Sequence, residues 1–343
     1  MKFTQVIENN KDQRGIWNIL WNILRIRRSF REKTLVFMSK RYSNVFYYYA
    51  NRILYEWNIT IHSRIKNKRK LIIRQFRQVF GVVPDLNNPK TLNEKLQWLK
   101  LYDHKDLYTM CADKYGVREY IREKFGDDFL IPLVYHTNDW RTINAKTINH
   151  FPCIVKANHS SKDFVIIKNE KDIDWNKLQL ECRWWLHRDY YAESLEWQYK
   201  NIKRQIVVEE LLQTSNGHIP NDYKLHYFNG VLQFVYVSVD REGCNARNIY
   251  DPDWKPLFFQ WNGRDRNAEN RRGDEIAPPK SFEQMKQFGS IIAKDFKYVR
   301  VDYYDVEGRL YFGEITLQHG GGFDVFVPDS YDLYFGDMLN IQD

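Results

Sequence analysis

Alternating apolar residues that flank tight turns constrain the fold of this chain more than any other feature. The dipeptide Asn229-Gly230, which a type I′ turn prefers, separates two such runs at 224–228 and 231–239. A second pair of runs lies within 299–315, around the turn Val306-Glu307-Gly308. Both patterns predict antiparallel β-hairpins in which one face of each strand is buried.

Helical patterns alternate with strands along the rest of the chain. Thr91-Leu-Asn-Glu94 is a capping box, in which the Thr and Glu side chains satisfy backbone N–H groups, and it predicts a helix through Leu99. Further helices are expected at 112–124, 176–180, 190–199 and 281–293. Further strands are expected at 130–135, 153–157, 164–168 and 205–212. Helices combined with antiparallel hairpins make the fold class α+β.

Basic residues are concentrated in the first 80 positions. Residues 1–80 contain 18 Lys and Arg against four acidic residues, an excess of +14, whereas residues 81–343 carry −6. Aromatic residues are also frequent there, and apolar residues follow a helical spacing between Ile16 and Ile26. Such a helix can lie on an anionic membrane surface, bind a partner helix or pack on the rest of the protein. RNA binding by this basic region is a further interpretation. However, no RRM, KH or helix-turn-helix pattern accompanies the charge, so we expect no nucleic-acid partner.

Composition excludes several classes of protein. Hydrophobic residues make up 43% and aromatic residues 16%, too many for a disordered chain. The four cysteines stand far apart without a Cys-x-x-Cys pair, which argues against a disulfide scaffold and a zinc ribbon. The sequence has no run of about 18 apolar residues and no secretory signal, so we expect a cytoplasmic protein.

Two strand ends carry residues suited to a nucleotide. Lys156 lies near the end of an apolar strand that leads into a polar loop, where a lysine can reach phosphate groups. Glu209 and Glu210 close the strand at 205–212, where backbone groups can bind an adenine ring while Leu212 packs on its face. Each feature taken alone also fits an ordinary strand end in solvent.

The second hairpin carries a pair of carboxylates. Asp302 and Glu314 can face the same side of the two antiparallel strands, and Arg300 shares that face because side chains alternate with a period of two. Two hard carboxylate oxygens suit Mg²⁺, which also takes phosphate oxygens. The hairpin therefore predicts a magnesium site beside a nucleotide, the alternative being a hairpin with solvated charges.

Taken together, these features resemble the ATP-grasp superfamily over roughly residues 90–325. The segments that resemble ATP-grasp motifs are Asp113-Lys114 with Arg118, Pro152-Cys-Ile-Val-Lys156-Ala157, Val208-Glu-Glu-Leu-Leu212, Asp222-Tyr-Lys224 with Arg241, Arg300-Val-Asp302, and Glu314-Ile-Thr316. Within the superfamily the sequence is similar to the TupA-like branch. The segments that carry this likeness are Pro89-Lys-Thr-Leu-Asn-Glu-Lys-Leu-Gln-Trp98, Ala112-Asp-Lys114, Asp222-Tyr-Lys224, Asp240-Arg241, Tyr250-Asp251 and Gly313-Glu-Ile-Thr316.

The resemblance implies an ATP-grasp fold, in which two α+β lobes sandwich ATP. It divides the chain into a basic, aromatic-rich helical region (1–80), an N-terminal lobe with a linker (81–150), a nucleotide lobe (151–212) and a C-terminal lobe with the magnesium site (213–343).

The resemblance also implies roles for individual residues. Arg300, Lys224 and Arg241 would be catalytic, and Asp302, Glu314 and Thr316 would bind Mg²⁺, with Thr316 standing where the family usually has Asn. The expected ATP-binding residues are Lys114, Lys156, Ser160, Ser161, Glu209, Glu210, Leu212 and Asp222. The loop 158–163 lacks the glycines usual in the family, so serine hydroxyls and backbone amides would have to hold the phosphates.

The implied activity is an ATP-dependent carboxylate–amine ligase that forms an amide through an acyl phosphate. In the TupA-like branch the substrates would be a surface glycan or its lipid-linked precursor, such as a uronic acid, and an amine or amino acid. The basic arm would then bind the inner face of the bacterial plasma membrane. Alternatives are a glycosyltransferase of capsule synthesis, using Asp172-Ile-Asp174 or Asp251-Pro-Asp253, an ATP-grasp kinase, and an inactive binding protein.

Overall fold

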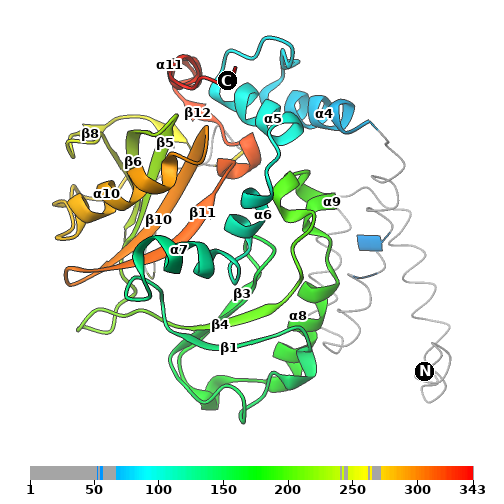
Figure 1. Cartoon of the computed structure of the whole chain (residues 1–343), viewed down its shortest axis with the longest axis vertical. Coiled ribbons are helices and arrows are strands. Elements are labelled where there is room, and N and C mark those ends of the chain that lie inside the picture. The colour runs from blue at the N-terminus through cyan, green and yellow to red at the C-terminus, as the bar shows by residue number, and fades with distance from the viewer. Residues whose placement is uncertain are drawn as a thin grey trace.

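The structure, a computed structural model, has two main β-sheets with helices around them (Figure 1). A third, two-stranded sheet is formed by β9 (Gln260–Trp261) and β12 (Phe326–Val327). It describes residues 52, 55, 56, 67–239, 242, 246–261, 263, 264 and 272–342. Most of the predicted basic helical region lies outside the described residues. Within the described part, no helix combines the length and the apolar character needed to cross a bilayer.

The smaller sheet has four antiparallel strands in the order β1-β4-β2-β3. Its strands are β1 (Leu133–Thr137), β2 (Cys153–Ala157), β3 (Phe164–Ile167) and β4 (Ile206–Glu210). Alternate residues of β2, Cys153, Val155 and Ala157, are fully buried in a core that includes Cys182 and Trp185 of helix α8. The residues between them therefore point to the other face of the sheet.

The larger sheet has six strands in the order β11-β10-β5-β6-β7-β8. Its strands are β5 (Asp222–Phe228), β6 (Val231–Val239), β7 (Ala246–Tyr250), β8 (Pro256–Leu257), β10 (Tyr298–Val306) and β11 (Arg309–Thr316). Both predicted hairpins are present, with Asn229 and Gly230 at positive φ as a type I′ turn requires. The second turn has two residues, Glu307 and Gly308, because Val306 pairs with Arg309.

Helices cover both faces of the larger sheet and leave part of one face open. The α-helices are α4 (Lys68–Phe80), α5 (Leu92–Tyr102), α6 (Asp106–Ala112), α7 (Val117–Phe125), α8 (Trp175–His187), α9 (Tyr190–Ser194), α10 (Phe282–Ala293) and α11 (Ser330–Met338). Helix α10 packs on one face through Met285 and Ile292. On the other face, α5 and α11 cover the aromatic side chains of Phe228 and Phe234.

The capping box that begins α5 is confirmed. Thr91 accepts a hydrogen bond from the Glu94 backbone N–H, and the Glu94 carboxylate accepts one from the Thr91 N–H. Lys95 then donates to the carbonyl oxygens of Gly336 and Leu339, both at 2.7 Å, which ties α5 to the end of α11.

The helix expected at 112–124 is wrong in its first turn. Helix α6 ends at Ala112, and α7 begins only at Val117. Asp113 has an extended backbone, and its carboxylate accepts a hydrogen bond from the Tyr115 N–H at 2.8 Å. This local turn competes with helix formation, which is the known behaviour of Asp. As a result, Lys114 lies in a loop between two helices.

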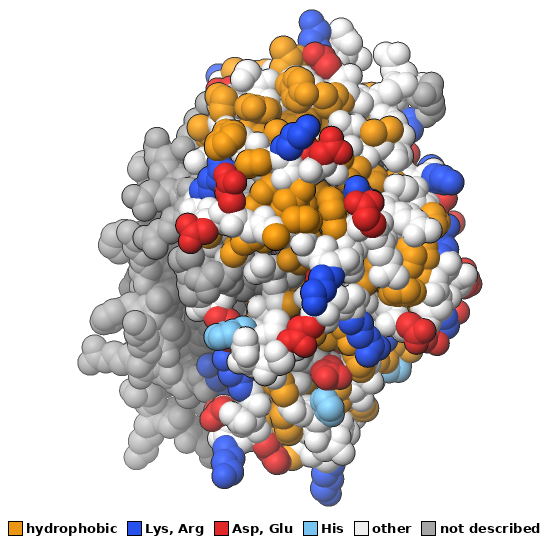
Figure 2. Space-filling view, turned by 90° about the vertical axis from the view of Figure 1, so that its left-hand side faces the viewer, with side chains coloured by type: hydrophobic (Ala, Val, Ile, Leu, Met, Phe, Trp, Pro, Cys, Tyr) orange, Lys and Arg blue, Asp and Glu red, His pale blue; other side chains and the backbone are white. Residues whose placement is uncertain are grey.

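The described part of the surface in Figure 2 mixes charges of both signs. Lys and Arg side chains are interspersed with Asp and Glu, and apolar side chains gather in the upper half of this view. This face therefore presents no broad single-sign patch of the kind that attracts nucleic acid.

Candidate active site

A cleft of about 380 Å³ lies between the two sheets, which is within the usual size range of small-molecule sites. Strands β2, β3, β5 and β10 contribute alternate residues, as the pleat requires, whereas β4 and β11 each contribute two consecutive residues. The smaller sheet supplies Ile154 and Lys156 from β2, Phe164 and Ile166 from β3, and Glu209 and Glu210 from β4. The larger sheet supplies Asp222 and Lys224 from β5, Arg300, Asp302 and Tyr304 from β10, and Gly313 and Glu314 from β11.

The lining of the cleft combines apolar and charged side chains. The apolar ones include Ile131, Ile154, Ile166 and Leu212, and two large ones on β3 are exposed: Phe164 by 50% and Ile166 by 36%. Five cationic side chains also line the cleft: Lys114, Lys156, Lys162, Lys224 and Arg300. Apolar side chains together with several cations suit a molecule that has an aromatic ring and an anionic tail.

On the smaller sheet, the Lys156 ammonium does not point freely into solvent. Its Nζ lies 2.5 Å from Oε2 of Glu209, which is buried, and Arg118 of α7 approaches Oε1 of the same carboxylate at 3.2 Å. Two cations thus share one buried carboxylate, so the group carries a net positive charge at the wall of the cleft.

The loop 158–163 is held by polar contacts from several elements. The Asn158 side chain donates to Asp113 at 2.8 Å and to the carbonyl of Lys203 at 2.9 Å. The Lys114 ammonium donates to the carbonyl of Ser160 at 2.8 Å. Arg188 binds both oxygens of Asp163, at 2.6 and 2.7 Å. These hydrogen bonds and ion pairs hold the loop 158–163 in one conformation, although it contains no glycine.

One buried group in this loop has no partner in the described part of the chain. The Ser160 hydroxyl is buried, lines the cleft and makes no hydrogen bond there. A buried hydroxyl without a partner is costly, and a ligand oxygen in the cleft would satisfy it.

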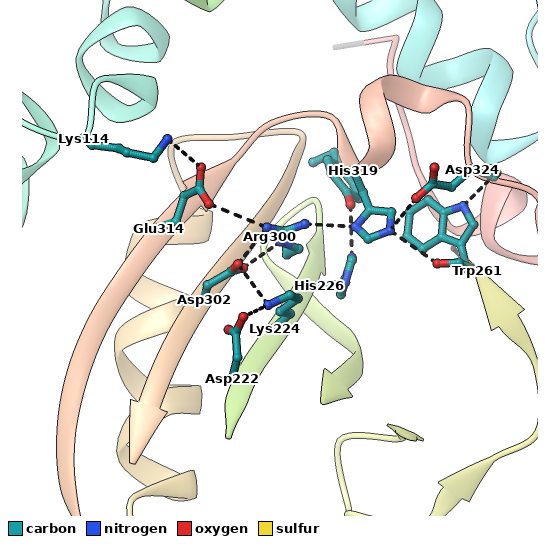
Figure 3. Close-up of polar contacts among 11 residues, drawn as sticks. Lys114, Asp222, Lys224, His226, Trp261, Arg300, Asp302, Glu314, His319 and Asp324 are labelled. Carbon is teal, nitrogen blue, oxygen red and sulfur yellow. Dashed lines mark hydrogen bonds and ion pairs between the residues drawn. The ribbon is translucent and has the colours of Figure 1, made fainter. Parts of the chain in front are cut away.

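On the larger sheet, Asp302 and Glu314 are direct partners across β10 and β11. Arg300 holds both oxygens of Asp302, at 2.6 and 2.7 Å, and Lys224 lies 3.5 Å from the same carboxylate (Figure 3). Glu314 is less tightly bound, since Lys114 approaches it at 3.4 Å and Arg300 at 3.9 Å. Lys224 also forms an ion pair with Asp222.

The two carboxylates differ in their electrostatics. Burial raises the pKa of Asp302, although Arg300 and Lys224 oppose that shift. Burial also tends to raise the pKa of Glu314. The positive charges of Lys114, Arg300 and Lys156 outweigh this effect, and the pKa of Glu314 is lowered. Glu314 is therefore an anion at neutral pH, held by cations from both sides of the cleft.

The model of the TupA-like ATP-grasp family matches residues 94–340 of the sequence. The chain belongs to the TupA-like ATP-grasp family. Membership confirms the predicted ATP-grasp fold. No curated protein matches the sequence.

Solved structures with similarity to this TupA-like protein include three ligases. The D-alanine–D-alanine ligase of Bacillus anthracis is 14% identical, with a TM-score of 0.35 over 61% of this chain and 57% of the ligase. The Helicobacter pylori enzyme is 16% identical, with a TM-score of 0.39 over 73% and 69%. The ATP-grasp ligase PsnB, solved with a phosphomimetic variant of its minimal precursor, Mg and ADP, is 12% identical, with a TM-score of 0.34 over 62% and 52%. This chain thus spans little more than half the length of the first and third.

Most of the residues predicted for the site of this TupA-like protein meet in the cleft. The cleft-lining members are Lys114, Lys156, Ser160, Ser161, Glu209, Glu210, Leu212, Asp222, Lys224, Arg300, Asp302 and Glu314. Thr316 is paired with Arg300 in register but is not among the residues that line the cleft. Arg241 lies outside the described residues.

The two Asp-x-Asp motifs lie away from the cleft. The Asp251 carboxylate accepts hydrogen bonds from the N–H groups of Asp253 and Lys255, and Asp174 caps the start of α8. These are the turn and cap roles that Asp commonly has, so the motifs give the glycosyltransferase alternative no support.

Sequence analysis missed His319 and Asp324, which extend the polar network beyond Arg300 (Figure 3). The signal available in the sequence was the run His319-Gly-Gly-Gly322, which follows the carboxylate hairpin directly. Its glycines all have positive φ.

The donor set of the cleft fits a magnesium ion that is shared with a nucleotide. No cluster of three or more His, Cys, Asp or Glu side chains suited to a metal exists among the described residues. Mg²⁺ commonly takes only one or two carboxylates and completes its octahedron with phosphate oxygens and water. Asp302 and Glu314 supply such a pair at the wall where the cations gather.

Proposed function

We propose that this protein uses ATP to join a carboxylate to an amine, with the nucleotide bound in the cleft between the two sheets. The observation that carries the proposal is the arrangement of that cleft. Apolar side chains and five cationic side chains line it together, and Asp302 and Glu314 are two of its six carboxylates. This is the combination that Mg-ATP requires.

In the proposed complex the adenine ring lies in the apolar part of the cleft. Ile154 and Ile166 would face the ring from the smaller sheet, and backbone groups at Glu210 to Leu212 would bind its edge. The triphosphate would then extend along Lys156 and the loop 158–163, with the Ser160 hydroxyl donating to a phosphate oxygen. Lys224 would approach the phosphates from the larger sheet.

The proposed reaction has two steps. An oxygen of the substrate carboxylate attacks the γ-phosphorus of ATP, which breaks the bond to ADP and gives an acyl phosphate. The amine, having lost a proton, then attacks the acyl carbon, and inorganic phosphate leaves as the amide forms. The acyl phosphate is needed because an unactivated carboxylate has a very poor leaving group.

In the proposed mechanism Arg300 would stabilise both transition states. Its Nε and one Nη2 hydrogen bind Asp302, and one Nη1 hydrogen binds His319. The remaining hydrogen on each terminal nitrogen has no hydrogen-bond partner in the described part of the chain. These two N–H groups can donate to an oxyanion, first on the transferred phosphoryl group and then on the tetrahedral carbon.

Asp302 and Glu314 are the residues that would hold Mg²⁺. The ion would neutralise phosphate charge during transfer. Glu314 is the more available ligand, because its ion pairs are longer than those of Asp302.

We further propose that the acceptor is a surface glycan or its lipid-linked precursor, carrying a uronic acid, and that an amino acid or other amine is joined to it. This step rests on the TupA-like family and on the +14 charge of residues 1–80, which suits an anionic membrane surface. The protein would act on the inner face of the plasma membrane.

Calorimetry with Mg-ADP and with Mg-AMPPNP tests the nucleotide site directly. Binding in the micromolar range supports the proposal, and tight binding of a UDP- or GDP-sugar with no binding of adenine nucleotides would overturn it. The reaction class follows from products formed with uronic-acid glycans and amino acids. A ligase releases ADP and inorganic phosphate together, whereas a kinase releases ADP alone.

A further inference from the structure

Arg300 contacts the protein on two sides, and only one of them is the cleft. Asp302 and Glu314 lie toward the cleft, whereas His319 lies on the opposite side of the guanidinium (Figure 3). The Nη1 nitrogen of Arg300 is 3.1 Å from Nδ1 of His319. The histidine is 7% exposed, so it is not part of the open cleft.

The protonation of His319 follows from its partners. An arginine can only donate, so Nδ1 of His319 must carry the lone pair that accepts this hydrogen bond. The proton of the neutral ring is then on Nε2, which lies 3.2 Å from Oδ2 of Asp324 and 3.4 Å from the carbonyl oxygen of Trp261. Burial lowers the pKa of His319, with Asp324 opposing the shift, and Arg300 adds to the lowering.

Residue Asp324 is itself fixed in place. The backbone carbonyl of Asp324 accepts hydrogen bonds from the indole of Trp261 at 3.1 Å and from the side chain of Asn93 at 3.0 Å. A Cβ atom on Gly320 would collide with the Asp324 carboxylate, and Gly320 also has a φ of +57°. The glycine run is therefore needed to let the carboxylate reach His319.

We propose that His319 and Asp324 form a positioning pair that fixes the guanidinium of Arg300 for transfer of the γ-phosphoryl group. The inference rests on the proposed function. Asp302 binds one edge of the planar group, and His319 binds a nitrogen at its far end. Contacts at two separate points fix both the plane and the rotation of the guanidinium, so its two remaining N–H groups point in one defined direction. Pre-oriented donors of this kind need no reorganisation during the reaction.

A purely structural role for His319 makes different predictions. The ring also packs against Trp261, at a centroid separation of 4.2 Å, so it contributes to the core whatever it does to Arg300. Loss of packing would change the melting temperature and the affinity for all nucleotides alike. Loss of Arg300 orientation would change the recognition of the γ-phosphate alone.

The test uses three variants of the full chain and one reference variant, and it measures the ratio of dissociation constants for Mg-ADP and Mg-AMPPNP by calorimetry. His319→Leu keeps the approximate size but removes the acceptor for Arg300. His319→Asn keeps an acceptor at the position of Nδ1. Asp324→Asn keeps the shape of the carboxylate, but its amide can donate to Nε2, which moves the ring proton to Nδ1, where it opposes Arg300. Arg300→Lys serves as the reference, because an ammonium cannot replace the paired N–H groups of the guanidinium.

We expect the preference for Mg-AMPPNP over Mg-ADP to fall about tenfold in His319→Leu and Asp324→Asn, because a hydrogen bond to a charged group is lost or misdirected. His319→Asn should retain most of the preference, and Mg-ADP affinity should stay within twofold in all three. If the ratio of the two dissociation constants is unchanged in His319→Leu and Asp324→Asn but the preference for Mg-AMPPNP is lost in Arg300→Lys, the positioning role is wrong. That result would not contradict the nucleotide site. No binding of either nucleotide to the unaltered chain would instead overturn the proposed function.

Discussion

Asp302 and Glu314 are paired residues on adjacent antiparallel strands, and a bulge follows directly after this pair. The register shifts between Asp302 and Tyr303, so that Phe312 rather than Gly313 faces Tyr303. Gly313 is the extra residue, and a Cβ atom there would lie 3.0 Å from the carbonyl oxygen of Asp302. The bulge thus lets two carboxylates line the cleft while Tyr303 and Phe312 remain in the core.

Glu314→Gln should abolish turnover with little effect on stability. The change removes one anionic ligand for Mg²⁺ and keeps the side-chain size, and the ion pairs that it breaks are long and partly exposed. We expect ADP release to fall about 100-fold or more, with a melting temperature within about 2 °C of the unaltered protein. Wild-type rates in this variant would show that the hairpin carboxylates do not bind the metal.

Asp302→Asn should lose both turnover and stability. Asp302 is the bidentate partner of Arg300, whose side chain is only 12% exposed, so its replacement leaves a largely buried guanidinium without its main counter-charge. Breaking one partner of a buried ion pair costs about 3 kcal/mol. Chemical denaturation of Asp302→Asn and Glu314→Gln side by side measures the difference, and equal stabilities would contradict the asymmetry seen here.

The strands and their faces could be predicted from the sequence, whereas contacts between distant segments could not. The alternation around Arg300 and Asp302 placed both on one face, because that relation depends only on the period of a strand. The link between Lys114 and Glu314 depends on how α6 and α7 lie against β11, which no local pattern encodes. His319 was missed for the same reason, since its partner Asp324 became adjacent only through the glycine turn.

The Lys156 side chain was predicted to reach phosphate groups, and the structure shows it paired with Glu209. Lys156→Met removes the ammonium and keeps the length of the stem, and it leaves Arg118 as the remaining cation on that carboxylate. We expect the dissociation constant for Mg-ADP to rise about tenfold, because one charge-assisted contact is lost. Lys168→Met is the matched control, since Lys168 follows the neighbouring strand, is 60% exposed and pairs with Glu242. Equal affinities for Lys156→Met and the control would remove Lys156 from the phosphate site.

Arg188 should control the mobility of the loop 158–163. Its Nη1 group donates to Asp163 at 2.6 Å. Its Nε and Nη2 groups donate to the two oxygens of Glu193, at 2.9 and 2.6 Å. Arg188→Lys keeps the charge but cannot bind both carboxylates through parallel N–H groups. Amide hydrogen exchange in the loop should rise severalfold, whereas Arg141→Lys, at a 72% exposed ion pair, should leave it unchanged. Unaltered exchange in Arg188→Lys would show that the other contacts of the loop suffice.

The basic region 1–80 should bind anionic membranes. Its excess of +14 predicts attraction to phosphatidylserine or phosphatidylglycerol vesicles, at about 1 kcal/mol for each base near the surface. Co-sedimentation of the full chain should be strong at low salt, weak at 0.5 M salt and weak with neutral phosphatidylcholine vesicles. A chain that binds neutral and anionic vesicles equally would contradict an electrostatic mechanism.

Asp332 should make the protein more stable at pH 5 than at pH 7. The carboxylate accepts hydrogen bonds from the backbone and side chain of Asn93, at 2.9 and 3.0 Å, but burial dominates and raises its pKa from 3.8 to about 6. Between these two values the unfolded chain releases its proton while the folded chain keeps it, so stability falls as the pH rises, by up to about 3 kcal/mol.

Asp332→Asn removes this dependence and keeps an acceptor for the Asn93 N–H. The melting temperature of Asp332→Asn relative to the unaltered protein should therefore be higher at pH 7 than at pH 5. The exposed replacement Asp253→Asn, at a side chain 77% accessible to solvent, should show no such change. A constant difference between Asp332→Asn and the unaltered protein across this range would mean that Asp332 is ionised in the folded protein even at pH 5.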